Sequence, residues 1–167
     1  METRRCGECG LCCKVVEFPE MDKPRGVWCR AYAPRTGCTI HETRPQTCRA
    51  FFCSWISHPE FDDAWRPDRA GFFMWEDPVP HGRRLILEVD ADRDEPWRRE
   101  PYWGVLRSIA YRAPGRPHVE VFVRTSERLQ VIFPEAVVDL GPRRELAIET
   151  GYRAAERGFE PYARYVE

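Results

Sequence analysis

Hydrophobic and polar residues are arranged differently in two parts of the chain, and the change falls near residue 54. Before it, glycines, cysteines and short polar stretches follow one another without a regular period. After it, apolar residues recur with the spacing of helices and strands. The pattern predicts an irregular segment over residues 1–53 and an α+β body over residues 54–167. The two parts are expected to pack together, and they could form one continuous domain.

Four apolar runs in the body have the alternation and flanking turn residues of strands. They predict two antiparallel pairs, residues 71–76 with 84–89 and residues 118–124 with 128–133. The turn of the first pair is expected over residues 77–82, and a further strand is a candidate at residues 136–140.

One helix is expected after Pro101, a residue that suits the first helical position. Its apolar face would carry Tyr102, Val105, Leu106, Ile109 and Ala113, and Pro114–Gly115 would end it. The region from residue 143 onward supports two interpretations. Leu146 and Ile148 alternate as in a strand, whereas Tyr152, Ala155 and Phe159 have helical spacing. Residues 54–68, rich in Trp, His and Pro, show no period that predicts an element.

Composition and charge are those of a folded protein. The 167 residues are 43% hydrophobic and 32% charged, enough apolar surface to offset the entropy of ordering one chain. The formal net charge of -1 lacks the basic excess of a simple phosphate-backbone binder, which disfavours nucleic acid as a partner. No run approaches the about 18 apolar residues of a membrane span, and no apolar leader precedes Cys6. We therefore expect a cytoplasmic protein without a membrane partner.

Cysteine is the residue type with the most uneven distribution. All eight cysteines lie within residues 1–53: Cys6, Cys9, Cys12, Cys13, Cys29, Cys38, Cys48 and Cys53. The first four form a CxxCxxCC run, in which two intervening residues let a tight turn direct both sulfurs at one ion at about 2.3 Å. Gly7 and Gly10 permit the backbone angles of such turns. In a reducing compartment this clustering indicates metal ligation rather than a disulfide framework, so all eight are candidate metal ligands.

Several ways of sharing the sulfurs are open. Neighbouring side chains usually point in different directions, so Cys12 and Cys13 are expected to serve different sites. Eight thiolates can form two tetrahedral four-sulfur sites. Alternatively, four hold one metal or cluster while the others form a second site, act in redox chemistry or pack as small apolar residues. His41 is a reserve ligand, and Arg30 and Arg49 are candidate hydrogen-bond donors to sulfur.

Zinc and iron both suit tetrahedral sulfur sites. The adjacent cysteines depart from the CxxCxxCxxxC run of ferredoxin-type clusters, and the few residues before Cys6 leave no room for the strand of a thioredoxin-like fold. We favour zinc, because closed four-thiolate sites would hold together a segment too polar to form its own core. Iron or an iron–sulfur cluster is the alternative cofactor.

The cysteine segment also resembles a known family. The CxxCxxCC start and the later stretch CTIHETRPQTCRAF at residues 38–51 are similar to the YkgJ-type cysteine-cluster family, described as a zinc- or iron-chelating domain. The resemblance covers residues 6–53 and implies metal binding by the seven cysteines from Cys6 to Cys48, with Cys53 extending the pattern. Related clusters occur in flagellin lysine methylases, so an enzymatic role stays open.

Local signals refine this segment and the body. Pro45 predicts a short helix that carries Cys48, and Phe51 and Phe52 are expected to pack the segment onto the body. The carboxylates over residues 88–95 lack the Gly and Glu of a calcium loop, so a solvated turn is expected there. The tryptophans of the body could form a stacking surface near Arg98–Arg99, but their large apolar area favours the core. No nucleotide-binding, serine-hydrolase or zincin motif occurs.

Two hypotheses follow. In the first, the protein chelates zinc or iron through cysteine thiolates, with a mainly structural or regulatory metal, in an irregular Cys-rich module packed on a small antiparallel sheet with at least one helix. In the second, an iron–sulfur cluster serves an enzyme or electron-transfer protein in redox or protein-modification chemistry. The sequence assigns no catalytic residue and indicates no protein partner.

Overall fold

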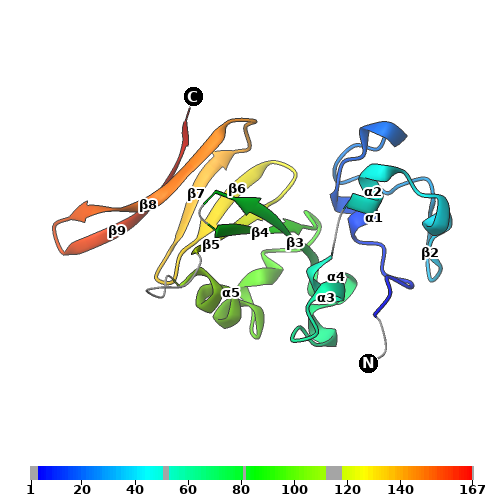
Figure 1. Cartoon of the computed structure of the whole chain (residues 1–167), viewed down its shortest axis with the longest axis horizontal. Coiled ribbons are helices and arrows are strands. Elements are labelled where there is room, and N and C mark those ends of the chain that lie inside the picture. Colours follow the sequence, from blue (N-terminus) through cyan, green and yellow to red (C-terminus); the bar gives the residue numbers. More distant parts are fainter. Residues whose placement is uncertain (1–3, 51–52, 81, 112–117, 167) are drawn as a thin grey trace.

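The computed structural model of the protein describes residues 4–50, 53–80, 82–111 and 118–166. The fold is α+β, with mostly strands and few helices. The Cys-rich segment lies at one end, a five-stranded sheet in the middle and a two-stranded hairpin at the other end (Figure 1). Among the described residues, no helix has the length and apolar character needed to cross a membrane.

Short elements and turns make up the Cys-rich segment, as its irregular pattern predicts. They are α1 (Cys12–Val15), η1 (Pro19–Met21), β1 (Tyr32–Ala33), β2 (Gly37–Cys38), η2 (His41–Thr43) and α2 (Gln46–Ala50). The helix predicted after Pro45 is confirmed as α2, which carries Cys48. Gly37 has a φ of +84°, and a Cβ there would lie 2.1 Å from the carbonyl oxygen of Gly7. Only glycine therefore allows β2 to approach the first cysteine turn this closely.

The stretch for which the sequence predicted no element forms three short helices between the segment and the sheet. They are α3 (Ser54–Ser57), η3 (Asp63–Trp65) and α4 (Pro67–Ala70). Trp55 and Trp65 are buried in the core beneath the sheet, as is Trp97 of η4 (Pro96–Arg98). Arg98 stacks over Trp97 and Trp103, so the aromatic and basic residues near position 98 pack on each other.

The central sheet has the strand order β3-β4-β5-β6-β7. Its strands are β3 (Phe72–Val79), β4 (Gly82–Val89), β5 (His118–Arg124), β6 (Arg128–Ile132) and β7 (Val137–Pro142). Both predicted antiparallel pairs and the candidate last strand are confirmed, although β3 runs through residues 77–79, which were expected to form a turn. The expectation of an antiparallel sheet is wrong at one place, because β4 and β5 pair in parallel. The long connection that contains α5 returns the chain to the starting end of β4, which a short turn could not do.

The predicted helix is α5 (Tyr102–Ala110), which begins one residue after Pro101. Leu106 and Ala110 are buried against the sheet, but Val105, predicted on the apolar face, is 37% exposed. The expected last helical residue, Ala113, and the terminating Pro114–Gly115 lie outside the described residues.

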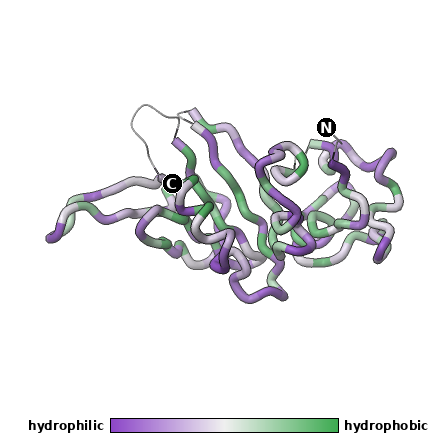
Figure 2. The backbone as a smooth tube through the Cα atoms, turned by 90° about the horizontal axis from the view of Figure 1, so that it is seen from below, coloured by the Kyte–Doolittle hydropathy of each residue, from purple (hydrophilic) through white to green (hydrophobic). Residues whose placement is uncertain are grey.

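The C-terminal region is a hairpin of β8 (Ala147–Ala155) and β9 (Gly158–Val166), so its helical interpretation is wrong. Tyr152 and Ala155 lie in β8 and Phe159 lies in β9, so these three positions do not belong to one face of one element. Within β8, Ile148 and Tyr152 are four residues apart and share one face. Ile148 and Tyr152 of this face pack against the outer apolar face of the sheet. Figure 2 shows that hydrophobic segments gather along the central strands, while the hairpin is mixed in hydropathy.

Apolar and charged contacts dock the Cys-rich segment on the sheet. Leu11, Val15, Val16 and Phe18 form one buried cluster with Phe73 of β3. Lys14 Nζ lies 2.7 Å from Asp90 Oδ1, and Arg25 Nη1 lies 2.5 Å from Glu88 Oε2. The expectation of a solvated turn over residues 88–95 is therefore wrong for Glu88 and Asp90, which are buried because they neutralise cations of the other segment. Phe51 and Phe52, expected to make this contact, lie outside the described residues.

Candidate metal centre

One cavity collects every cysteine of the protein. It has a volume of about 700 Å³, lies between the Cys-rich segment and Phe73 of β3, and is lined by all eight cysteines. Every one of them is a free thiol. Cys29 is buried and the others are half-buried. Residues that are far apart in the sequence thus present their sulfurs to a common space.

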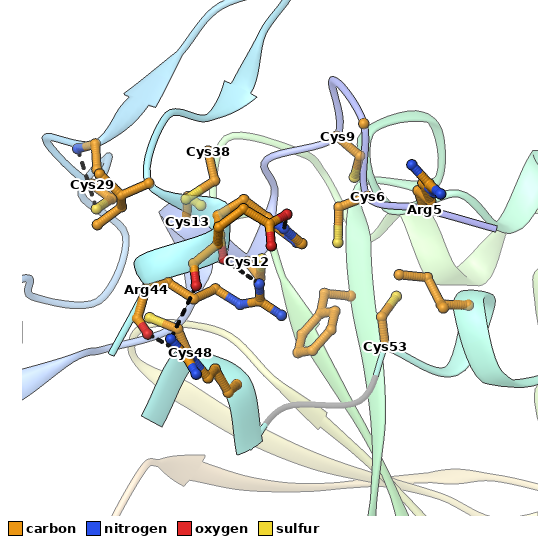
Figure 3. Close-up of a pocket in the computed structure, with 18 of the residues that line it drawn as sticks. Arg5, Cys6, Cys9, Cys12, Cys13, Cys29, Cys38, Arg44, Cys48 and Cys53 are labelled. Atoms are coloured by element: carbon orange, nitrogen blue, oxygen red, sulfur yellow. Dashed lines mark hydrogen bonds and ion pairs between the residues drawn. The ribbon is translucent and has the colours of Figure 1, made fainter. Parts of the chain in front are cut away.

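The cysteines come from different elements and occupy the two sides of this cavity. Cys13, Cys29, Cys38 and Cys48 lie on one side in Figure 3, and Cys6, Cys9 and Cys53 on the other, with Cys12 between them. Cys12 and Cys13 belong to α1, Cys38 to β2 and Cys48 to α2, whereas Cys53 directly precedes α3. Short elements therefore position four of the sulfurs, and the other four lie in the irregular chain between elements.

Backbone amides support four of the sulfurs with the same local geometry. The amide of Ala31 donates to Cys29 Sγ at 3.4 Å, and the amides of Leu11, Ile40 and Trp55 interact with the sulfurs of Cys9, Cys38 and Cys53. Each donor follows its cysteine by two residues. Such hydrogen bonds stabilise a thiolate and orient the sulfur, so this backbone is suited to negatively charged cysteine.

Burial opposes ionisation of the thiols in the cavity. It raises the pKa of Cys48 and of Cys53 to about 11 and also raises the pKa values of Cys6, Cys9 and Cys38. These thiols are protonated at neutral pH, and a metal must displace their protons.

The adjacent thiols of α1 behave differently. A hydrogen bond from Cys12 to Cys13, together with burial, raises the pKa of Cys12 well above its usual value, and the same hydrogen bond lowers the pKa of Cys13 to about 7. The two thiols are therefore coupled to each other, with Cys13 the more easily ionised of the pair.

Cationic side chains approach the sulfurs. The guanidinium of Arg44 favours the thiolates of Cys6, Cys38 and Cys48. Lys23 is a second cation beside the sulfurs, and burial lowers its pKa to about 8 although the nearby cysteines oppose the shift. Sequence reasoning missed both residues, since neither directly follows a cysteine.

Arg30 and Arg49, the candidate donors to sulfur, donate to backbone carbonyls. Arg30 reaches the carbonyl of Met21 at 2.9 Å, and Arg49 reaches those of Arg44 and Glu42. The reserve ligand His41 lines the cavity, with Nδ1 3.6 Å from Glu42 Oε1.

The sulfurs do not converge on a single point in this arrangement. Among the residues that the structure describes, no group of three or more cysteine, histidine or carboxylate side chains is placed so that it could hold a metal ion. The chemistry of the donor set fits zinc or iron, but the cysteine side chains would have to turn toward a common centre to bind either.

Comparisons of the chain with models of known families, with curated proteins and with solved structures find no match.

Proposed function

We propose that the protein binds metal through its clustered cysteine thiolates, that zinc is the metal, and that its role is mainly structural or regulatory. The observation that supports this most directly is the meeting of eight free thiols in one cavity. Packing alone does not require small apolar side chains to share one cavity, whereas ligation of a metal by thiolates does.

The local structure of the Cys-rich segment supports a stabilising role. Its elements are only two to five residues long, and helices this short are not stable without tertiary contacts. The buried cluster that docks it involves α1 and η1, whereas the chain around β1, β2 and η2 contributes no buried apolar residue to that cluster. Metal–sulfur bonds would join these loops to α1 and α3 and so stabilise the folded segment.

Elemental analysis of protein purified without oxygen and without a His tag tests the proposal. We expect stoichiometric zinc, colourless protein, and loss of ordered structure in residues 6–53 on chelation, measured by hydrogen exchange. Chain without metal, or full protection of the segment after complete chelation, would contradict it. Iron with acid-labile sulfide and a visible charge-transfer band would instead support the iron–sulfur alternative.

A further inference from the structure

We infer that the cavity holds two metal ions in two separate four-sulfur sites. The first site takes Cys13, Cys29, Cys38 and Cys48, and the second takes Cys6, Cys9, Cys12 and Cys53. This division rests on the proposed function and goes beyond it, because it fixes the number of ions and the ligands of each. A tetrahedral zinc ion takes four ligands, so one ion leaves half of the cysteines unused.

Proximity within the cavity divides the cysteines in this way. The thiols that act electrostatically on Cys48 are Cys13, Cys29 and Cys38, whereas those that act on Cys53 are Cys9 and Cys6. The same two sets lie on opposite sides of the cavity in Figure 3. The thiols that act on Cys6 are Cys13 and Cys38 of the first set, whereas Cys6 itself acts on Cys53 and Cys12, so it lies where the two sets meet.

Cys12 and Cys13, which are adjacent on α1, lie where the two sets meet. Apart from Cys13, the thiols that act on Cys12 are Cys6 and Cys9, both members of the second set. The side chains of adjacent residues in a helix point about 100° apart. This divergence suits ligands of two neighbouring ions better than two ligands of one ion. The hydrogen bond between Cys12 and Cys13 would be replaced by one metal–sulfur bond on each side.

Backbone amides support sulfurs in both sets. Cys29 and Cys38 of the first set and Cys9 and Cys53 of the second each interact with the amide two residues further on, and the amide of Cys6 supports a third sulfur of the second set. Each set therefore contains at least two sulfurs that the backbone prepares for thiolate charge.

Cations are distributed in the same manner. Four thiolates around a divalent ion leave a net charge of about -2 at each site. Lys23 acts on Cys13 and Cys29 of the first set and also on Cys12 of the second. Arg66 acts on Cys9 of the second set, where the carboxylate of Asp68 opposes it. Arg44 lies between the sets and acts on Cys6 as well as on Cys38 and Cys48. Each proposed site thus has cationic neighbours that offset its charge.

Paired substitutions and cobalt titration distinguish the sets. Reduced, metal-free protein titrated with Co²⁺ under nitrogen should bind two ions with tetrahedral thiolate spectra. The variant Cys29→Ser/Cys48→Ser, altered within one set, should keep one ion, whereas Cys29→Ser/Cys53→Ser, altered across the sets, should keep none. Ser108→Ala, on the distant helix α5, should keep both.

The outcomes separate the two proposals. No cobalt bound by the unaltered protein would contradict the proposed function itself. One ion per chain, or the same loss from both double variants, would overturn only the division into sets.

Alkylation of the unaltered protein checks the ligands without any substitution. As zinc is added, mass spectrometry should show the four cysteines of a set becoming protected together. Protection of a group that mixes the two sets would refute the assignment even if two ions bind.

Discussion

Lys14 joins the Cys-rich segment to the sheet through a buried ion pair, and its replacement by methionine tests how that segment is held. The Nζ atom lies 2.7 Å from Asp90 Oδ1 and 2.5 Å from Asp92 Oδ2. The side chains of Lys14 and Asp90 are each 11% exposed, whereas that of Asp92 is 80% exposed. In Lys14→Met the stem still packs, but the Asp90 carboxylate loses its cation and keeps a neutral donor, the amide of Asp92, at 3.2 Å.

The expected cost follows from this difference in burial. Removing one partner of a buried ion pair costs about 3–5 kcal/mol, whereas an exposed contact such as that with Asp92 adds about 0–1 kcal/mol. We expect Lys14→Met to lower the free energy of unfolding by about 3 kcal/mol and the Tm by about 6–12 °C for a chain of this size. Adding Asp90→Asn should recover about 1–2 kcal/mol, because it removes the charge left unpaired.

Urea unfolding of the reduced, metal-free protein measures these changes, and the rate of thiol labelling reports on the cavity. Lys14→Met should label faster than the unaltered chain, since α1 loses its charged contact with Asp90 and keeps its apolar packing against β3. The matched control is Arg128→Met, which removes an exposed pair with Asp139 at 2.7 Å and should cost less than about 1 kcal/mol. A cost for Lys14→Met as small as that of the control, or further destabilisation by Asp90→Asn, would refute the reasoning.

Three other predictions concern the core, the cavity and its protons. The side chain of Glu88 is 5% exposed and is the counter-ion of Arg25, Arg124 and Arg143. Glu88→Gln should therefore lower the free energy of unfolding by about 3 kcal/mol. A decrease of less than about 1 kcal/mol in urea titration would contradict this. Gly37→Ala should destabilise the fold and weaken zinc binding at least tenfold, because the added Cβ would meet Gly7. Its control, Gly26→Ala, has a φ of +76° and open space, so it should lower the free energy of unfolding by only about 1 kcal/mol and leave zinc affinity unchanged. Equal zinc affinities of the two variants would argue against the close approach of Gly37 to Gly7. Because burial raises the pKa of Cys48 to about 11, zinc must displace the proton of this thiol. Calorimetry in buffers of different ionisation enthalpy should therefore detect proton release, and the zinc affinity should rise from pH 6 to pH 8. A zinc affinity that does not depend on pH would exclude Cys48 as a ligand.

Local signals in the sequence determined much of the fold. Alternation and turn residues located four strands of the central sheet, and Pro45 and Pro101 marked the starts of α2 and α5. The spacing of the cysteines singled out the segment whose thiols line the cavity. These features depend on residues close together in the chain, so a single sequence records them.

Tertiary structure decided the features that depend on distant partners. The parallel pairing of β4 with β5 depends on how the connection through α5 packs, and the strand pairing of β8 with β9 resolves a spacing that also fits a helix. Glu88 and Asp90 are ordinary surface residues by type, and they become buried because cations of the Cys-rich segment reach them. Likewise, the sequence shows eight cysteines clustered within residues 1–53, but only the folded structure determines which sulfurs are neighbours in the cavity. Periodicity depends on residues close together in the sequence, whereas the pairing of strands and side chains that are far apart in the sequence depends on how the whole chain packs.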